Sequence, residues 1–292
     1  MTNNPANIAV LLTVYNGHEF IKEQLDSILQ QQGVKLHIFI SVDLSTDNSY
    51  QWCCDFANKH LQISVLPYGQ KFGGAAANFY RLIKEVDFSA FDFVALSDHD
   101  DIWLEDKLLS ASNKLDDGHY AAYSGNVMAF WDNGRQHLIN KALAQRRYDY
   151  LFEAAGPGCT YVLSTGAMLL FKQLIISKWS QAEQVGLHDW FIYAFIRSHG
   201  LHWFIDPEYK LLYRQHSENQ VGINKGWQAN LKRLGLLRKG WCKQQVITIS
   251  DLIADHKLDL DSRLTILKNI RHLRRRFRDQ CILFFIALIG LY

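Results

Sequence analysis

Short apolar runs alternate with amphipathic helical patterns through the first hundred residues, and this alternation constrains the fold more than any other feature. The apolar runs cover residues 8–16 ("IAVLLTVYN"), 36–43 ("LHIFISVD"), 61–67 ("LQISVLP") and 91–97 ("FDFVALS"). The segments between them place apolar residues at helical spacing. Strand–helix alternation of this kind predicts an α/β fold, whose mainly parallel sheet is covered by helices on both faces.

Polar side chains stand where the predicted strands end. Thr13, Tyr15 and Asn16 close the first apolar run, Asp43 closes the second, and Asp98 follows the fourth. In open parallel sheets, ligands bind beyond the carboxyl ends of the strands. The sequence therefore predicts a ligand site at this edge of the sheet.

An acidic cluster, "SDHDD", follows the fourth run directly and contains Asp98, Asp100 and Asp101. Three carboxylates this close repel one another unless a positive charge lies between them, and Mg²⁺ or Mn²⁺ prefers such oxygen ligands. The alternative is that these aspartates cap the helix predicted at residues 102–115 ("IWLEDKLLSASNKL"). A cap needs only one aspartate, so we favour the metal interpretation.

Five segments resemble, in the same order, the motifs of the family 2 glycosyltransferases, which are inverting enzymes of GT-A fold. "TVYNGHEFIKEQLDSILQQ" is similar to the first motif and "SVDLSTDNS" to the nucleotide-binding loop. "LSDHDDIWLEDKL", "GLHDWFIYAF" and "IDPEYKLLYRQHSENQVG" resemble segments of the rhamnosyltransferase-like branch. The resemblance runs from about Ile8 to Gly222.

The resemblance implies a donor site for a UDP- or dTDP-sugar. Thr13, Tyr15 and Asn16 match positions around the nucleotide, and Asp43 matches the carboxylate that accepts a hydrogen bond from the pyrimidine base. Asn78, in "GGAAANF", matches a position that lines the donor pocket.

The resemblance also implies a metal site and a catalytic base. Asp98 matches the aspartate near the ribose and the metal, Asp100 the direct ligand of Mn²⁺ or Mg²⁺, and His216 a position that completes the metal site. Asp189 matches the base that takes the proton of the acceptor hydroxyl. Considered without the resemblance, Asp189 is a plausible helix N-cap and His216 a surface histidine.

The chain departs from the family pattern in the base-binding loop. Leu44 stands where the loop usually has glycine, so we expect the loop to follow a different path. His99 replaces the usual glutamine, a change of little expected consequence. Further along, residues 156–171 ("GPGCTYVLSTGAMLLF") are expected to form a loop followed by a strand.

The charge is divided unevenly along the chain. Residues 1–220 carry 17 Lys and Arg against 24 Asp and Glu, whereas residues 221–292 carry 14 against 5. We therefore expect a catalytic domain over residues 1–220 and a basic helical region over residues 221–292, which should contact something anionic.

The basic region mixes cations with tryptophan and leucine and ends in the apolar run 281–292 ("CILFFIALIGLY"). This run is too short for a spanning helix, which needs about twenty residues. Basic amphipathic helices of this type predict binding to an anionic membrane surface. The alternatives are packing on the catalytic domain, packing within an oligomer, and binding of nucleic acid. We place nucleic acid last because it would not need an apolar terminus.

Five cysteines without a CxxC pair favour a reducing compartment, and the N-terminus lacks the features of a signal peptide. These observations predict a peripheral protein at the cytoplasmic face of the bacterial inner membrane.

The predicted function is metal-dependent, inverting transfer of a sugar to a lipid-linked saccharide in bacterial surface polysaccharide synthesis. The "DHDDIW" resemblance suggests rhamnose as the sugar. One rival is a nucleotidyltransferase acting on sugar phosphates, but "TVYNGHEF" is not the glycine- and arginine-rich phosphate loop that such an enzyme needs. The other is a non-catalytic nucleotide-sugar binding or scaffold protein, which would not require Asp189.

Overall fold

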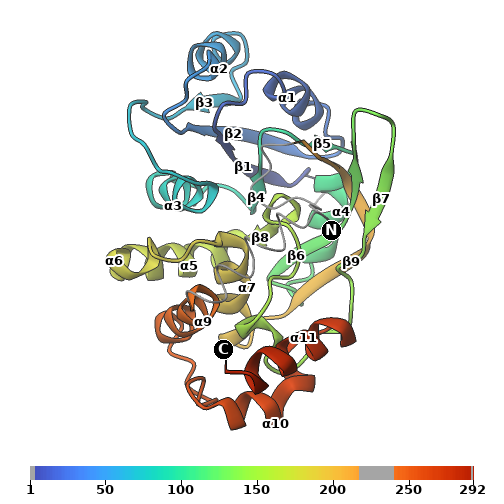
Figure 1. The fold of residues 1–292 in the computed structure, drawn as a ribbon. Coiled ribbons are helices and arrows are strands. Elements are labelled where there is room, and N and C mark those ends of the chain that lie inside the picture. The colour runs from blue at the N-terminus through green and yellow to red at the C-terminus, as the bar shows by residue number, and fades with distance from the viewer. Residues whose placement is uncertain (1–3, 217–239, 291) are drawn as a thin grey trace.

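One nine-stranded sheet organises the chain in the computed structural model, which describes residues 4–216, 240–290 and 292 (Figure 1). The strand order is β3-β2-β1-β4-β8-β6-β9-β5, and β7 pairs with β6. The strands are β1 (Asn7–Val14), β2 (Lys35–Val42), β3 (Ile63–Val65), β4 (Phe93–Ser97), β5 (Ile102–Trp103), β6 (Ala122–Phe130), β7 (Gln136–Ile139), β8 (Val162–Ser164) and β9 (Trp203–Arg214).

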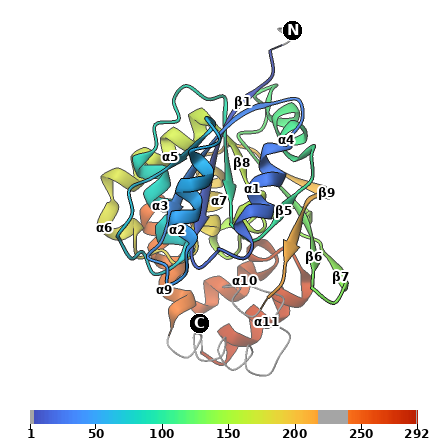
Figure 2. The same cartoon turned by 90° about the horizontal axis from the view of Figure 1, so that it is seen from above.

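Helices cover this sheet, and the C-terminal helices lie together at one end of the molecule (Figure 2). The α-helices are α1 (Ile21–Leu29), α2 (Ser49–Ala57), α3 (Ala75–Glu85), α4 (Lys107–Leu115), α5 (Thr165–Ser177), α6 (Trp179–Ala182), α7 (His188–Ser198), α9 (Trp241–Leu252), α10 (Arg263–Leu273) and α11 (Phe277–Leu288). Two short 3₁₀ turns, η1 (Asp149–Leu151) and η2 (Gly158–Thr160), precede β8.

The N-terminal half has the predicted parallel arrangement. β1 pairs in parallel with both β2 and β4, and β2 pairs in parallel with β3. Side chains alternate along β1, so that Ala9 and Leu11 join a core cluster with α3, α5 and α7, whereas Val10 and Leu12 join a second cluster with α1, α2 and α4. The prediction of an α/β fold with helices on both sheet faces is confirmed.

The second half of the sheet is mixed, and two local predictions there hold only in part. β8 is antiparallel to β4 and β6, whereas β6 and β9 are parallel. The strand expected within residues 156–171 is only Val162–Ser164; Ser164 then accepts a hydrogen bond from the Ala167 backbone amide and starts α5. The helix expected from residue 102 begins only at Lys107, because Ile102 and Trp103 pair with β9.

The C-terminal helices α9, α10 and α11 pack against the rest of the molecule near α6 and η1. Arg275, which precedes α11, is buried and forms ion pairs with Asp149 and Glu153, at 3.5 and 3.3 Å. The predicted boundary at residue 220 and the basic residues up to 239 lie outside the described residues, so the two-domain division stays a prediction. Among the described helices, none is both long and apolar enough to cross a bilayer.

Candidate active site

A cleft of about 1200 Å³ opens beyond the carboxyl ends of β1, β2 and β4 and continues to the C-terminal helices. It gathers side chains from widely separated parts of the sequence. All the predicted site residues line it, namely Thr13, Tyr15, Asn16, Asp43, Asn78, Asp98, Asp100, Asp189 and His216. The structure thus brings the whole predicted set to one cavity, while their individual roles stay predictions.

Asp43 lies at the base of the cleft, directly after β2. Its carboxylate accepts hydrogen bonds from the backbone amides of Phe72 and Gly73, at 2.7 and 2.9 Å, and from that of Leu44 at 2.7 Å. These bonds fix the carboxylate without filling all its acceptor positions. Gly73 has a φ of 79°, which favours glycine, whereas Leu44 does not adopt a positive φ. Leucine is therefore accommodated in this turn without backbone strain.

Two asparagines hold the surrounding backbone. Asn16, with a φ of 45°, accepts a hydrogen bond from the Thr46 amide at 2.8 Å and so ties the end of β1 to the loop before α2. Asn78 donates to the Ser41 carbonyl at 3.0 Å, while its own buried Oδ1 has no partner among the described residues. An unpaired buried acceptor beside the cleft is a position where a ligand donor would be favourable.

The acidic loop between β4 and β5 does not cap a helix. The helix α4 begins at Lys107 with Asp106 at its N-cap, well beyond Asp98 and Asp100, so the capping alternative is wrong. Burial raises the pKa of Asp98 to about 7, and the Asp100 and Asp189 carboxylates add to the shift. This concentration of negative charge is one that a bound cation would relieve.

Asp100 is paired with His216 across the cleft, with 2.8 Å between Oδ2 and Nε2. Burial is the largest single influence on Asp100 and opposes its ionisation, but the hydrogen bond from His216 and the nearby His99 and His216 rings together outweigh it and lower the pKa of the carboxyl. His216 also stacks on Phe20, with ring centroids 5.0 Å apart. The carboxylates of Asp98 and Asp100 and the imidazole of His216 are donors of the kind that Mg²⁺ or Mn²⁺ accepts, so their chemistry fits the implied metal. Among the described residues, however, the three side chains whose ligand atoms all lie within 4.8 Å of one another are Asp98, Asp101 and Cys159.

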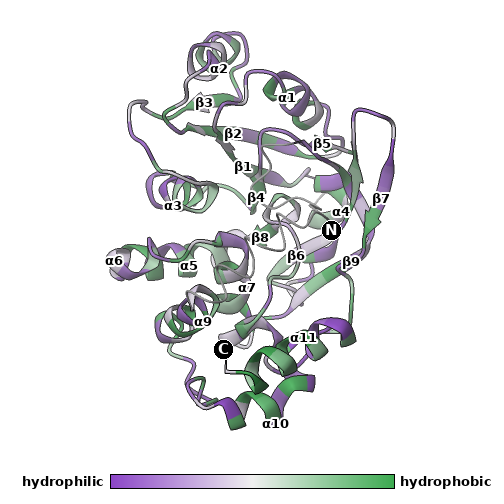
Figure 3. Ribbon diagram, viewed as in Figure 1, coloured by the Kyte–Doolittle hydropathy of each residue, from purple (hydrophilic) through white to green (hydrophobic). Residues whose placement is uncertain are grey.

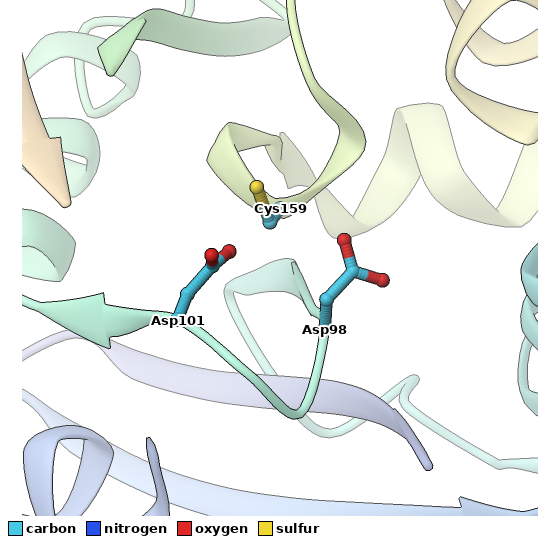
Figure 4. A group of neighbouring side chains, drawn as sticks. All are labelled: Asp98, Asp101 and Cys159. Atoms are coloured by element: carbon cyan, nitrogen blue, oxygen red, sulfur yellow. The ribbon is translucent and has the colours of Figure 1, made fainter. Parts of the chain in front are cut away.

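A second cluster lies behind this loop, where Asp98, Asp101 and Cys159 place ligand atoms within 4.8 Å of one another (Figure 4). Burial raises the pKa of the Cys159 thiol well above its usual range, and Asp101 adds to the shift. The thiol therefore keeps its proton and makes a poor ligand for a cation that prefers oxygen. Burial lowers the pKa of the neighbouring Lys107 to about 7. We interpret this cluster as a buried polar support for the acidic loop.

Asp189 faces the acidic loop from the first turn of α7. Burial raises the pKa of Asp189 to about 6, although the Trp190 amide donates to its Oδ1 at 2.8 Å and favours the ionised form. The adjacent His188 is buried against Phe79, and burial lowers its pKa to about 3, so it is neutral. The raised pKa of Asp189 and its place in the cleft suit a proton acceptor near neutral pH.

The cleft also contains residues that lie outside the sequence motifs and were not predicted to belong to the site. Lys141, from the loop after β7, lies near Asp189. Arg274 contributes from the turn between α10 and α11, and Arg278 from the first turn of α11. Lys141 belongs to no recognised motif. The two arginines belong to the basic region 221–292, which we predicted to bind a membrane surface. Tertiary packing, which the sequence does not reveal, places them beside the cleft.

Comparison with known proteins decides the family. Residues 9–176 match the family model described as Glycosyl transferase family 2. The chain is a family 2 glycosyltransferase. It is also 46% identical, over 84% of its length and 85% of the relative's, to the dTDP-rhamnosyl transferase RfbG of Shigella flexneri. The resemblance to the rhamnosyltransferase-like branch is therefore confirmed.

More distant proteins resemble this glycosyltransferase in sequence or in fold. The Escherichia coli protein WfgD, named UDP-Glc:alpha-D-GlcNAc-diphosphoundecaprenol beta-1,3-glucosyltransferase, is 21% identical over 56% of this chain and 61% of its own. Staphylococcus aureus TarS 1-349 in complex with UDP superposes with a TM-score of 0.57 and 15% identity, covering 87% of this chain and 68% of that one. The Pyrobaculum calidifontis mannosyltransferase PcManGT, solved with GDP-Man and Mn²⁺, has a TM-score of 0.53 and 16% identity, covering 99% and 88%. These structures confirm the GT-A fold.

Proposed function

We propose that this glycosyltransferase moves rhamnose from dTDP-rhamnose to a saccharide acceptor, with inversion at the anomeric carbon. The observation that carries the donor assignment is the 46% identity to a dTDP-rhamnosyl transferase over most of both chains. A UDP-sugar is the alternative donor, supported by the UDP-glucose in the name of WfgD and by UDP bound to TarS. Asp43 and Asn78, which line the cleft, are the proposed contacts of the pyrimidine nucleotide.

The reaction requires one base and a stabilised leaving group. The acceptor oxygen attacks the anomeric carbon from the face opposite the diphosphate, and Asp189 takes the hydroxyl proton. The bond between the sugar and the diphosphate breaks, and its electron pair passes to the phosphate oxygen. Asp98, Asp100 and His216 would hold Mg²⁺ or Mn²⁺, which supplies charge stabilisation to the diphosphate. Asp189 is suited to its role because its raised pKa makes the carboxylate a stronger base.

The proposed acceptor is a lipid-linked saccharide, presented at the cytoplasmic face of the bacterial inner membrane during surface polysaccharide synthesis. The diphosphoundecaprenol acceptor in the name of WfgD supports this class. So does the surface of α11, where Phe277, Phe285, Leu288 and Ile289 are exposed by 56–78%. In Figure 3, α11 is coloured hydrophilic at its start and hydrophobic over the rest of its length.

A transfer assay with purified protein tests the donor. With Mn²⁺ and a lipid-linked saccharide from a bacterial membrane extract, dTDP-rhamnose should support release of dTDP, and UDP-glucose and UDP-GlcNAc should not. Turnover with a UDP-sugar in preference to dTDP-rhamnose would contradict the donor assignment while leaving the family unaffected.

A further inference from the structure

The cleft does not end at Asp189. Its wall continues along the loop after β7 and over the C-terminal helices, where Lys141, Arg274 and Arg278 are joined by Ile282 and Ile286 of α11. In Figures 1 and 2, α7 lies between the carboxyl ends of β1 and β4 on one side and α10 and α11 on the other. The cavity therefore has a nucleotide end and a separate cationic, apolar end.

The arginines of residues 274–278, around the start of α11, fall into two pairs with different surroundings. Arg275 forms ion pairs with Asp149 and Glu153, and Arg276 donates a hydrogen bond to the Asn140 carbonyl. These two side chains anchor α11 on the catalytic part of the molecule. Arg274 and Arg278, from the same run, line the cleft instead.

The cations at this end are only partly compensated. In the described parts of the chain, the Lys141 ammonium has neither an ion pair nor a hydrogen bond, and the buried Nε of Arg274 has no acceptor. Arg278 pairs at 3.0 Å with Asp279, but 74% of its side chain is exposed. Burial lowers the pKa of Lys141, and the nearby Arg275 adds to the shift. Glu153 and Asp279 lie at the same end of the cleft and offset part of this charge. The Lys141 ammonium and the Nε of Arg274 still lack a hydrogen-bonded partner among the described residues, so a bound anion would stabilise them.

The position of these cations separates them from the predicted donor diphosphate. That diphosphate is expected at Asp98, Asp100 and His216, at the strand ends. Lys141 instead interacts with Asp189, which faces the acceptor in the proposed reaction. An anion held by Lys141 and Arg278 would therefore belong to the acceptor.

The apolar residues beside the cations indicate what the anion is attached to. Ile282 and Ile286 line the cleft next to Arg278, and the exposed side chains of Phe285 and Ile289 continue the apolar surface along α11. A molecule with a diphosphate joined to an alkyl chain matches both features. The diphosphate would meet the cations, and the chain would follow α11.

We infer that Lys141, Arg274 and Arg278 form a subsite for the diphosphate of a prenyl-linked acceptor, with Ile282 and Ile286 contacting the first part of its chain. The inference rests on the proposed function, because it assigns the acceptor end of the same cleft. These three residues position the acceptor and do not take part in the proton transfer.

The test is direct binding of a soluble short-chain prenyl diphosphate to the full chain, with dTDP and Mn²⁺ present in excess to fill the donor end. The double variant Lys141→Gln/Arg278→Gln should weaken this binding by about tenfold or more, since charge-assisted contacts of this kind are lost. Arg271→Gln is the matched control, because Arg271 is an exposed cation of α10 outside the cleft. Lys141→Arg should retain much of the affinity.

Two further measurements decide the assignment. The double variant should bind dTDP as the wild type does, and the prenyl alcohol without diphosphate should bind weakly to both. If the double variant lost as much affinity for dTDP as for the prenyl diphosphate, the cations would belong to the donor site. If it bound the prenyl diphosphate as the wild type does, the cations would not form a subsite for it. Either result overturns the inference. Because the readout is binding, an enzyme that uses a donor other than dTDP-rhamnose would still show the subsite, so the two proposals fail separately.

Discussion

At the scale of single residues, Asp189 is the side chain on which the proposed chemistry depends. It lies in the first turn of α7, partly buried in the cleft, and its carboxylate receives a hydrogen bond from the Trp190 amide. Burial raises its pKa to about 6, so the group is ionised at neutral pH yet basic enough to take a proton. The neighbouring His188 is neutral and packed on Phe79, which leaves the base role to Asp189.

Replacement of Asp189 by asparagine should lower kcat by roughly 10²–10⁴-fold, the usual contribution of a general base. Affinity for dTDP should be unchanged, because Asp189 lies on the acceptor side. Glu183→Gln, at an exposed position outside the cleft, is the control and should retain activity. An Asp189→Asn enzyme that turns over at the wild-type rate would exclude this carboxylate as the base.

The wild-type rate should also depend on pH through the same group. Because the base acts in its deprotonated form, kcat should be lost as the pH falls through about 6 and reach a plateau above it. Initial rates between pH 5 and 8 measure this profile. A rate that stays constant across that range would contradict the raised pKa of Asp189.

At the scale of elements, the close contact between η2 and α7 fixes the orientation of α7, the helix that carries Asp189. Gly158 lies in η2, and a Cβ added there would be 2.3 Å from Nε2 of His188. His188 cannot easily move, because its ring lies 4.1 Å from that of Phe79 and its side chain is buried. Only glycine therefore allows this approach at the first turn of α7.

Gly158→Ala should displace His188 and with it Asp189. We expect a loss of about 1–3 kcal/mol in the free energy of unfolding, as for other overpacked core positions, together with a lower kcat. Chemical denaturation and initial rates measure the two effects. Gly166→Ala is the control, because nothing lies within 4 Å of the place that an alanine methyl group would take there, and alanine favours the helix α5. Equal stability of the two variants would show that the η2 contact is not tight.

The elements near the N-terminus could be predicted because their signal is local. Strands β1 to β4 and their helices follow from apolar periodicity, and the polar residues at the strand ends follow from the topology. The short strand β5 could not be predicted, because Ile102 and Trp103 are held by pairing with β9, far along the chain. Lys141 and Arg274 were missed for a similar reason, since long-range packing alone brings them to the cleft.

At the scale of the whole molecule, α11 lies at the opposite end from strands β1, β2 and β3 (Figure 1). Phe285 and Ile289 are exposed by 60% and 66%, while Leu283 and Ala287 on the other face are buried. The helix is therefore anchored by one face and presents the other to its surroundings. Beside the cationic end of the cleft, such a face suits contact with an anionic membrane surface.

The double variant Phe285→Ser/Ile289→Ser should reduce sedimentation with vesicles that contain anionic lipid by about tenfold, because two exposed apolar anchors are lost. Its melting temperature should stay close to that of the wild type. Leu61→Ser is the control, since Leu61 is fully exposed in the loop between α2 and β3, away from α11. If both variants sediment like the wild type, the α11 face does not mediate membrane binding.

The most direct measurement of the central claim is calorimetric titration of the full chain with dTDP and with UDP, each with and without Mn²⁺, in the wild type and in Asp100→Ala. We expect dTDP to bind more tightly than UDP, Mn²⁺ to strengthen the binding, and Asp100→Ala to remove the effect of the metal. Binding that is indifferent to Mn²⁺ and to Asp100 would contradict the assignment of the acidic loop as the metal–diphosphate site.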